Sequence, residues 1–433
     1  MIDDSATGAP ALDDARAREL RADFPLLAQQ VHGHPLAYLD FGATSQRPQA
    51  VIDAERAFVE RCNSAVHRGA HELAAIATGE FEAARERVAA FVGADPDEIA
   101  WAPGATDALN TVANGIAAAS RGRGGDESAP LRLGPGDEIV ITEAEHHANL
   151  VPWQELAIAT GATLRWVPVN ERGTWTLDDA RAVVTERTRV LAFAHVSNVT
   201  GLIAPVDGLV ALAREVGAIT VLDACQSVPH RPVDLHALGV DFAAFSGHKM
   251  AGPNGIGVLY GRRERFAQLP PSRTGGSMIE VVEMTGTTYL APPTRFEAGT
   301  QPVSQAVALA AACDYLDGVG MAAIAAHEEA LGARLVRGLS AIDGVRVLGD
   351  GADAPRSGLA SFVLEGVHSH DLSQFLDADG IAVRGGHHCA QPLHRALGIT
   401  ASTRASTYLT TTDDELDRLF DAVGRARAWF GAA

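Results

Sequence analysis

The sequence predicts an α/β fold with a mostly parallel sheet, followed by a smaller α+β module. Between residues 138 and 260, apolar strand-like runs alternate with amphipathic helical patterns. Near-continuous apolar strands joined by helices are typical of a parallel sheet covered on both faces. From about residue 305, two long helical stretches precede short strand-like runs, which places a domain boundary near residues 300–315.

The composition indicates a folded chain and argues against several function classes. Of 433 residues, 47% are hydrophobic and 21% charged, enough apolar surface to offset the entropy of ordering. A formal net charge of −19 argues against a nucleic-acid partner, since phosphate backbones need clustered positive charge. Charged residues interrupt every long apolar run and residues 1–10 lack a secretory pattern, so we expect no membrane span and a cytoplasmic location.

The four cysteines do not form a disulfide framework, because none stands in a CxxC spacing and the chain is long. Cys62, Cys225 and Cys313 are interpreted as small buried hydrophobes. Cys389 has a different context, because it follows two histidines.

The expected elements follow in order. A helical segment lies around residues 13–22, and the Gly-rich stretch 120–136 is a surface loop by composition. Helical patterns occupy residues 107–119, 151–159, 177–185 and 206–216. The strands of the sheet are expected at Glu138–Thr142, Thr163–Val169, Arg189–Val196, Ile219–Asp223, Phe242–Ser246 and Ile256–Tyr260.

The last third of the chain contains more helix than strand. Residues 270–293, rich in Gly, Ser and Thr, are expected to form a hairpin or a lid. Helices are expected at residues 304–316, 322–342, 371–378 and 413–428, and short strands at 345–348, 359–364 and 381–383. Because ligands of parallel sheets bind beyond the carboxyl ends of the strands, candidate site residues are those that follow a strand.

Lys249 is the single lysine among 35 lysines and arginines. It follows an expected strand, in Ser246-Gly-His-Lys249. Lysine can lose its proton and form an imine, which arginine cannot do. The alternative is one leftover lysine in an arginine-rich composition, but the strand-end context favours a ligand pocket.

Asp223 and Gln226 follow another apolar strand, in Val221-Leu-Asp-Ala-Cys-Gln226. A carboxylate at the end of a buried strand needs a partner, because an unpaired buried charge is costly. A protonated pyridine nitrogen would be such a partner. A pyridine aldehyde cofactor needs a lysine for the imine and an acid that keeps the ring nitrogen protonated, so Asp223 and Lys249 together predict this class of cofactor.

A phosphate on the cofactor would need hydrogen-bond donors. Pro103-Gly-Ala-Thr106 leads into a helical stretch, and a Gly-rich turn at a helix N-terminus offers free N–H groups to an anion. Thr106, Ser246 and His248 can add side-chain donors. The phosphate-loop spacings of nucleotide sites, GxxxxGK[ST] and GxGxxG, do not occur.

His146 lies in Glu145-His-His-Ala-Asn149, after the strand 138–142. A strand-end imidazole can stack on a cofactor ring and pass protons. The alternative is a surface or helix-capping histidine pair.

Cys389 lies in Arg384-Gly-Gly-His-His-Cys389, where the glycines predict a mobile loop and Gly385 is expected to loosen it. Neighbouring positive groups can lower the pKa of a thiol and create a thiolate nucleophile. A metal site from His387, His388 and Cys389 is disfavoured, because adjacent residues rarely fit one tetrahedral centre.

Arg384 and Arg404 are candidate clamps for a substrate carboxylate, which the guanidinium fork binds with two hydrogen bonds. A solvated surface arginine is the alternative for each. Their Gly-rich or hydroxyl-rich neighbours favour the clamp.

Together these segments resemble a known family. The sequence is similar to class V, fold-type I enzymes that use pyridoxal phosphate, and in particular to SufS-like group II cysteine desulfurases. The similarity runs in order from about residue 20 to the C-terminus. It rests on Tyr38-Leu-Asp-Phe-Gly-Ala-Thr-Ser45, Val66-His-Arg-Gly69, Gly104-Ala-Thr106, Glu145-His-His-Ala-Asn-Leu-Val-Pro-Trp153, His195-Val-Ser-Asn198, Leu222-Asp-Ala-Cys-Gln226, Phe245-Ser-Gly-His-Lys249, Gly275-Gly-Ser-Met-Ile279, Phe296-Glu-Ala-Gly-Thr300 and Arg384-Gly-Gly-His-His-Cys-Ala390.

The resemblance implies a domain organisation. Residues 36–305 would form a large domain with a mostly parallel seven-stranded sheet that binds pyridoxal 5'-phosphate. Residues 306–433 would form a small α+β domain that carries the Cys389 loop, and residues 1–35 would pack with the small domain.

The resemblance also implies cofactor contacts. Lys249 would bind pyridoxal phosphate through an imine, Asp223 would pair with the pyridine nitrogen, and Gln226 would bond the phenolic oxygen. His146 would stack on the ring, and Asn198 would also face the cofactor. The phosphate would be bound by Ala105, Thr106, Ser246 and His248, and by Thr300 of the second subunit of a homodimer.

The implied reaction converts L-cysteine to L-alanine. Asn198, Arg404, Arg384 and His67 would contact the substrate, and Cys389, Lys249 and His146 would be catalytic. Cys389 would take the sulfur as a persulfide and pass it to a SufE- or SufU-type acceptor for iron–sulfur cluster assembly. L-selenocysteine is a second candidate substrate.

Several alternatives stay open at this point. The same fold would serve a selenocysteine lyase, a kynureninase-like hydrolase or an aminotransferase, each of which would keep Lys249 and Asp223. A catalytically inactive scaffold or a sulfur-carrier binding module is the alternative from another class.

Overall fold

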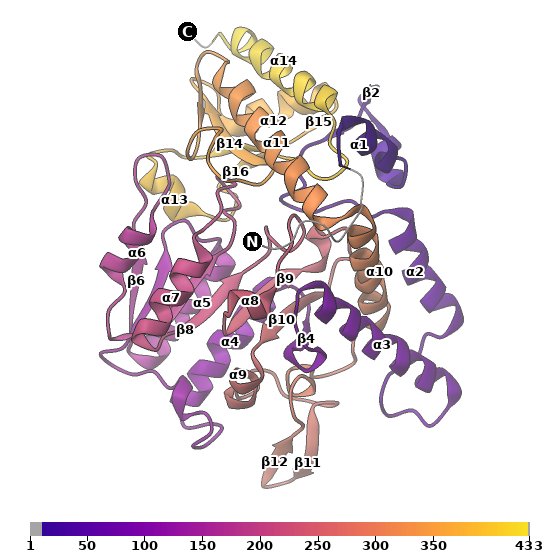
Figure 1. Ribbon diagram of the computed structural model, residues 1–433, viewed down its shortest axis with the longest axis vertical. Coiled ribbons are helices and arrows are strands. Elements are labelled where there is room, and N and C mark those ends of the chain that lie inside the picture. The colour runs from indigo at the N-terminus through magenta and orange to yellow at the C-terminus, as the bar shows by residue number, and fades with distance from the viewer. Residues whose placement is uncertain (1–10, 432–433) are drawn as a thin grey trace.

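The computed structural model describes residues 11–431, and a seven-stranded sheet forms the centre of its larger part (Figure 1). The strand order is β4-β10-β9-β8-β7-β5-β6. All neighbouring pairs from β9 to β6 are parallel, whereas β10 is antiparallel to both β9 and β4. The strands are β4 (Ile99–Ala102), β5 (Glu138–Thr142), β6 (Thr163–Val167), β7 (Thr188–Ala194), β8 (Ile219–Asp223), β9 (Phe242–Ser246) and β10 (Gly257–Gly261). The expected α/β architecture with a mostly parallel sheet is confirmed.

Helices cover both faces of this sheet. Alternate strand residues point to opposite sides, so that Val140 and Phe193 lie in one apolar core and Ile141 and Ala192 in the other. One face packs against α4 (Ala105–Ser120) and α5 (Val151–Thr160). The opposite face packs against α3 (Glu72–Phe91), α7 (Val206–Val216) and α10 (Val303–Val319).

The smaller part of the chain forms an antiparallel sheet of its own, in the order β13-β14-β17-β16 (Figure 1, top). Its strands are β13 (Val345–Val347), β14 (Leu359–Leu364), β16 (Arg384–Gly386) and β17 (Ser402–Ser406). The helices α11 (Met321–Ser340), α12 (Ser369–Ala378) and α14 (Asp413–Trp429) pack on this sheet. The expected strand near residue 381, β15 (Ile381–Ala382), instead pairs in parallel with β3 (Ala37–Tyr38).

The N-terminal helix α1 (Asp14–Arg21) contacts α14. Arg21 forms an ion pair of 2.9 Å with Glu415, and the backbone N–H of Asp413 donates to Asp14 at 2.7 Å. Residues 1–10 of the expected N-terminal segment, and residues 432–433, lie outside the described residues.

The division at residues 35 and 305 stays a proposal. The buried residues of α10 pack in the same core as α2 (Gln49–Arg61) and α3, whereas those of α11 from Leu331 onward pack with the small sheet.

The expected hairpin is present. β11 (Ile279–Glu283) and β12 (Gly286–Tyr289) form an antiparallel pair that projects at the bottom of Figure 1, with Val281, Val282 and Met284 exposed. The remaining elements are α6 (Leu177–Val183), α8 (Leu235–Leu238), α9 (Arg263–Gln268), α13 (Gln391–Ala396), β1 (Gln30–Val31) and β2 (His34–Pro35).

Over residues 11–431, no single helix has the length and apolarity needed to cross a membrane. The bent pair α10 and α11, at 75°, has them only when the two helices are taken together.

Candidate active site

One cavity at the carboxyl edge of the large sheet gathers all the predicted site residues except Thr300 and His67. The large sheet, the segment before α2 and the small sheet all contribute to it. Its lining consists of Gly42, Ala43, Ala105, Thr106, His146, Ala148, Ala194, Val196, Asn198, Asp223, Cys225, Gln226, Ser246, His248, Lys249, Arg384, His388, Cys389 and Arg404.

Asp223 and Lys249 reach this cavity from the ends of the neighbouring strands β8 and β9. Asp223 is the last residue of β8 and is 6% exposed, and its carboxylate accepts the N–H of Cys225 at 2.9 Å. No positively charged side chain within residues 11–431 forms an ion pair with it. A buried carboxylate without a cation fits a protonated pyridine nitrogen. Lys249 ends the short turn Gly247–Lys249 after β9.

The N-terminus of α4 forms the phosphate end of the cavity. The N–H of Ala105 donates to Oγ of Ser246 at 2.8 Å, while the next N–H groups of the first turn have no acceptor inside the helix. A side chain at Gly257 would place its Cβ 2.7 Å from Cα of Gly104, so glycine there lets β10 approach this turn. Burial, with the charge of Lys249, lowers the pKa of His248 to about 4. This end therefore offers neutral donors, which fit a phosphate.

His146 both lines the cavity and caps the turn that follows it. Its Nδ1 accepts the N–H of Ala148 at 3.0 Å, so the capping role considered from the sequence is correct as well. Burial lowers the pKa of His146 to about 4, against the opposing charge of Asp223. A neutral imidazole whose Nδ1 accepts a hydrogen bond carries its proton on Nε2.

Arg404 is the buried arginine of the cavity. It lies on β17 and is 2% exposed; Nη1 donates to the carbonyl of Asn198 at 3.0 Å and Nη2 to Asp40 at 3.3 Å. Its Nε is buried without a hydrogen-bond partner in the described structure. A free donor on a buried guanidinium fits a substrate carboxylate. Arg384, directly opposite on β16, is half-exposed and binds the other oxygen of Asp40 at 3.2 Å.

Cys389 is exposed, and the backbone of residues 388–389 is tied to two segments that follow strands of the large sheet. The N–H of His147 donates to its carbonyl at 2.7 Å, and Nδ2 of Asn198 donates to the carbonyl of His388 at 2.7 Å. His388 and Cys389 have φ values of 51° and 56°, the left-handed region, which turns the chain sharply. Their backbone is thus held while the Cys389 thiol faces the cavity opening.

The expectation that Gly385 loosens this segment is wrong. Residues 384–386 form the strand β16, and a Cβ on Gly385 would lie 2.7 Å from the carbonyl oxygen of Ser369. Glycine is therefore required by the close packing of β16 on α12. His388 is also engaged, because its Nε2 lies 3.0 Å from Oγ of Ser402, and burial lowers its pKa to about 2.

Several residues that line the cavity or hold its arginines were not expected from the sequence. Asp40, the shared partner of both arginines, and Gly42 belong to the Tyr38–Ser45 motif, which could have signalled them. Cys225 is buried, as expected, but it also lines the cavity, and burial raises the pKa of its thiol.

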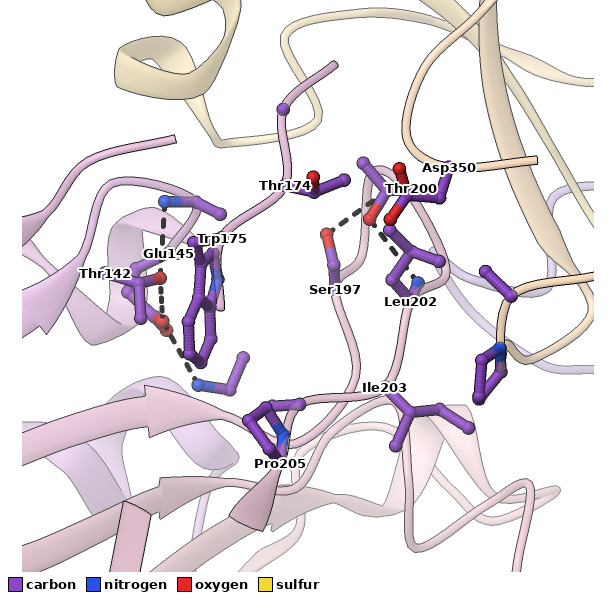
Figure 2. Close-up of a pocket in the computed structure, with 16 residues that line it drawn as sticks. Thr142, Glu145, Thr174, Trp175, Ser197, Thr200, Leu202, Ile203, Pro205 and Asp350 are labelled. Carbon is purple, nitrogen blue, oxygen red and sulfur yellow. Dashed lines mark hydrogen bonds between the residues drawn. The ribbon is translucent and has the colours of Figure 1, made fainter. Parts of the chain in front are cut away.

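A second pocket adjoins the first, since Ala194 lines both. Figure 2 shows Thr142 and Glu145 beside Trp175, with Ser197, Thr200 and Asp350 on the other side. The Glu145 carboxylate accepts hydrogen bonds from Oγ of Thr142 at 2.6 Å, Nδ2 of Asn149 at 2.7 Å and the N–H of Ala194 at 3.2 Å. Burial raises the pKa of Glu145 to about 7, and the nearby charge of Asp223 adds to the effect. None of the residues that line this pocket is a lysine, arginine or cysteine.

Thr300 and His67 lie outside both pockets of this chain. Thr300 is exposed in the segment before α10, and His67 is exposed before α3, with Nε2 2.9 Å from Glu82.

The aminotransferase class-V family model matches residues 37–419. A probable cysteine desulfurase of Mycobacterium leprae is 57% identical over 414 residues, which cover 95% of this chain and 97% of the relative. A probable cysteine desulfurase of Streptomyces coelicolor is 48% identical, with 98% and 100% of the two chains covered.

Solved structures give the same result. The apo structure of a cysteine desulfurase from Thermococcus onnurineus has a TM-score of 0.86 and 36% identity, covering 94% of this chain and 97% of its own. The Escherichia coli cysteine desulfurase CsdA has a TM-score of 0.83 and 36% identity, covering 95% and 98%. The chain therefore belongs to the class-V aminotransferases, a family that depends on pyridoxal phosphate, and within it to the cysteine desulfurases.

Proposed function

We propose that this protein converts L-cysteine to L-alanine and keeps the substrate sulfur on Cys389 as a persulfide. The observation that carries the proposal is that Cys389 and Lys249 line one cavity, together with the buried carboxylate Asp223. An amine, an acid and an accessible thiol are the three groups that this reaction needs from the protein.

The residues of the cavity fit the cofactor. Lys249 would hold its carbonyl carbon, Asp223 its ring nitrogen and the N-terminus of α4 its phosphate. When bound, the cofactor supplies an electron sink that stabilises negative charge at the substrate Cα. Arg404 orients the substrate through its carboxylate, and Nζ of Lys249 takes up and returns the Cα proton. The neutral imidazole of His146 can exchange its Nε2 proton.

The thiolate of Cys389 attacks the substrate sulfur. A sulfur–sulfur bond forms and the bond between the substrate Cβ and its sulfur breaks. The electron pair of the broken bond stays with the substrate Cβ, which takes up a proton. The products are L-alanine and a persulfide on Cys389. The anchored backbone of residues 388–389 holds the sulfur while the exposed thiol stays open to an acceptor.

The destination of the sulfur belongs to the same proposal. A SufE- or SufU-type acceptor would take the persulfide sulfur for iron–sulfur cluster assembly in the cytoplasm, and the enzyme would work as a homodimer with Thr300 reaching the phosphate of its partner. L-selenocysteine is an alternative substrate at the same site.

The test is sulfide release from L-cysteine, together with mass spectrometry of the Cys389 peptide. The holoenzyme should form alanine and carry an added sulfur on this peptide. Cys389→Ser should lose both while keeping the visible absorbance of the bound cofactor. Cys62→Ala, which changes a half-buried thiol at the end of α2, should behave as the unmodified protein.

Two results would contradict the proposal. Full desulfuration activity in the Cys389→Ser variant would show that the Cys389 thiol does not take part in the reaction. If the purified protein with added pyridoxal phosphate shows no visible cofactor absorbance, the proposal that it is a pyridoxal phosphate enzyme is wrong.

A further inference from the structure

Thr300 and His67, which lie outside the cavity, are joined to each other through one network of charged side chains. Its centre is Arg85 on α3. On one side Arg85 binds Glu297, three residues before Thr300; on the other side it binds Glu82, which holds His67.

The pair of Arg85 and Glu297 is buried and fully bidentate. Nη1 and Nη2 of Arg85 lie 2.6 and 3.0 Å from the two carboxylate oxygens of Glu297, and the side chains are 3% and 2% exposed. The same carboxylate accepts the N–H of Trp101 at 2.8 Å, and Nη1 also donates to the carbonyl of Ile99 at 2.7 Å. Segment 297–300 is therefore fixed to β4 and α3, although Thr300 itself is exposed.

The other end of the network fixes His67. Nε of Arg85 donates to Glu82 at 2.9 Å, and the second oxygen of Glu82 lies 2.9 Å from Nε2 of His67. The N–H of His67 donates to Oγ of Thr78 at 2.9 Å, and the His67 ring packs edge-on against Phe81 at 5.8 Å. His67 has a φ of 71°, a conformation that a non-glycine residue keeps only when its surroundings enforce it.

Apart from Lys249, which would hold the carbonyl carbon of the cofactor, the phosphate end of the cavity in one chain has no charged side chain. This end carries the hydroxyls of Thr106 and Ser246 and the neutral imidazole of His248. The two arginines of the cavity are bound to Asp40 at the opposite end. In the described part of the chain, further donors for a dianion would therefore have to come from outside this cavity.

We propose that Arg85 and Glu297 are positioning residues that hold Thr300 and His67 as one rigid unit, which completes the cavity of a second copy of this chain. Thr300 then serves the cofactor phosphate and His67 the substrate. The inference rests on the proposed function, because it requires a homodimer that binds pyridoxal phosphate.

The first experiment measures cofactor binding, which depends on Thr300, and substrate binding, which depends on His67, as separate quantities. Arg85→Met in the holoenzyme should raise the dissociation constant for pyridoxal phosphate about tenfold, as expected for loss of a hydrogen bond to a charged group. Arg85→Lys, which keeps the charge but not the fork, should fall between Arg85→Met and the unmodified protein. Glu82→Ala should raise the KM for L-cysteine and leave the cofactor dissociation constant unchanged.

Arg87→Met is the matched control. Arg87 lies on the same helix and binds Asp314 and Asp317 on α10, away from both segments. It should change neither constant, so an equal effect of Arg85→Met and Arg87→Met would overturn the proposal. So would an unchanged cofactor dissociation constant in Arg85→Met.

A mixed dimer shows whether the unit acts between chains, even if Arg85→Met lowers stability. Chains carrying Arg85→Met and Cys389→Ser are co-expressed with different tags, and the heterodimer is purified. If the unit of one chain completes the cavity of the other, the heterodimer has one complete site. Its activity is then about half that of the unmodified dimer. If the unit acts within a chain, the heterodimer has no complete site. At a pyridoxal phosphate concentration too low to fill the weakened Arg85→Met site it is then nearly inactive, and the proposal fails even if unmodified protein desulfurates cysteine normally.

Discussion

Arg384 and Arg404 lie directly opposite each other on the antiparallel strands β16 and β17, and each binds a different oxygen of Asp40. Asp40 thus lies between two like charges that face one pocket and offsets part of their repulsion. The arrangement leaves Nε of the buried Arg404 free, whereas the side chain of Arg384 is 49% exposed. The two arginines are therefore unequal as ligands for a substrate carboxylate.

Arg404→Gln should raise the KM for L-cysteine about tenfold or more, because it removes a charged hydrogen bond in a buried site. Arg384→Gln should raise it by only about threefold, because water screens an exposed charge. Steady-state kinetics on both variants provide the measurement. A larger effect from Arg384→Gln would reverse the assigned roles.

Asp223→Asn should lower kcat by about a hundredfold while leaving the fold intact. The amide oxygen can still accept the N–H of Cys225, which now donates to the carboxylate at 2.9 Å. A neutral amide cannot hold a pyridine nitrogen in its protonated form, however, so the electron sink is weakened. Steady-state kinetics and the thermal midpoint are measured together. Unchanged kcat would mean that Asp223 does not face the ring nitrogen.

The sequence predicts the site well where parallel strands carry it. Asp223 ends a strand, and Lys249 and His146 each follow one. The carboxyl ends of parallel strands meet at one edge, so their proximity follows from the fold class. Asp40 could not be placed in this way. It contacts Arg404 across 364 residues of sequence, from a chain segment that pairs through the two-residue strand β3 and an isolated bridge between Asp40 and Ser406.

Short or irregular strands limit how much of the fold can be predicted from the sequence. β4 has four residues and β16 consists of Arg-Gly-Gly, too short for an alternating pattern to show. From the sequence, Gly385 is expected to add conformational freedom, whereas in the structure its role is to make room for Ser369. That contact is between distant segments, and no local property of the sequence reveals it.

Buried histidines should make the protein acid-sensitive. Burial lowers the pKa to about 4 for His146, His195 and His248 and to about 2 for His388. Between about pH 6.5 and pH 4 the unfolded chain therefore binds protons that the fold excludes, and the free energy of unfolding falls as the pH falls. The buried imidazoles of His195 and His388 each contribute up to about 1.4 kcal/mol per pH unit, and the partly exposed His146 and His248 contribute less.

Urea denaturation at about pH 7 and pH 5 measures this loss of stability. His195→Asn should make the difference between the two midpoints smaller, because one excluded proton is removed. His195 does not line the catalytic cavity, so activity at neutral pH serves as a control for folding. An unchanged difference would show that His195 is protonated in the fold or is not buried from water.

Glu145 should act in the opposite direction, on the alkaline side. Burial, together with the charge of Asp223, raises its pKa from 4.5 to about 7. The folded state therefore keeps a proton that the unfolded chain has lost, and this contribution to stability is present below about pH 4.5 and disappears as the pH rises through about pH 7. The neutral carboxyl can donate its proton to Oγ of Thr142, 2.6 Å away, so the structure accommodates both forms.

Glu145→Gln removes this titration without removing the side chain. The difference in thermal midpoint, variant minus unmodified protein, should increase from about pH 5 to pH 8, because only the unmodified protein has a carboxyl at position 145 that ionises in this interval. Asn149 and Ala194 set the absolute offset, since each donates a hydrogen bond that an amide group matches less well. A pH-independent offset between the two proteins would mean that Glu145 is already ionised at pH 5, and that its three donors outweigh the cost of burying its charge.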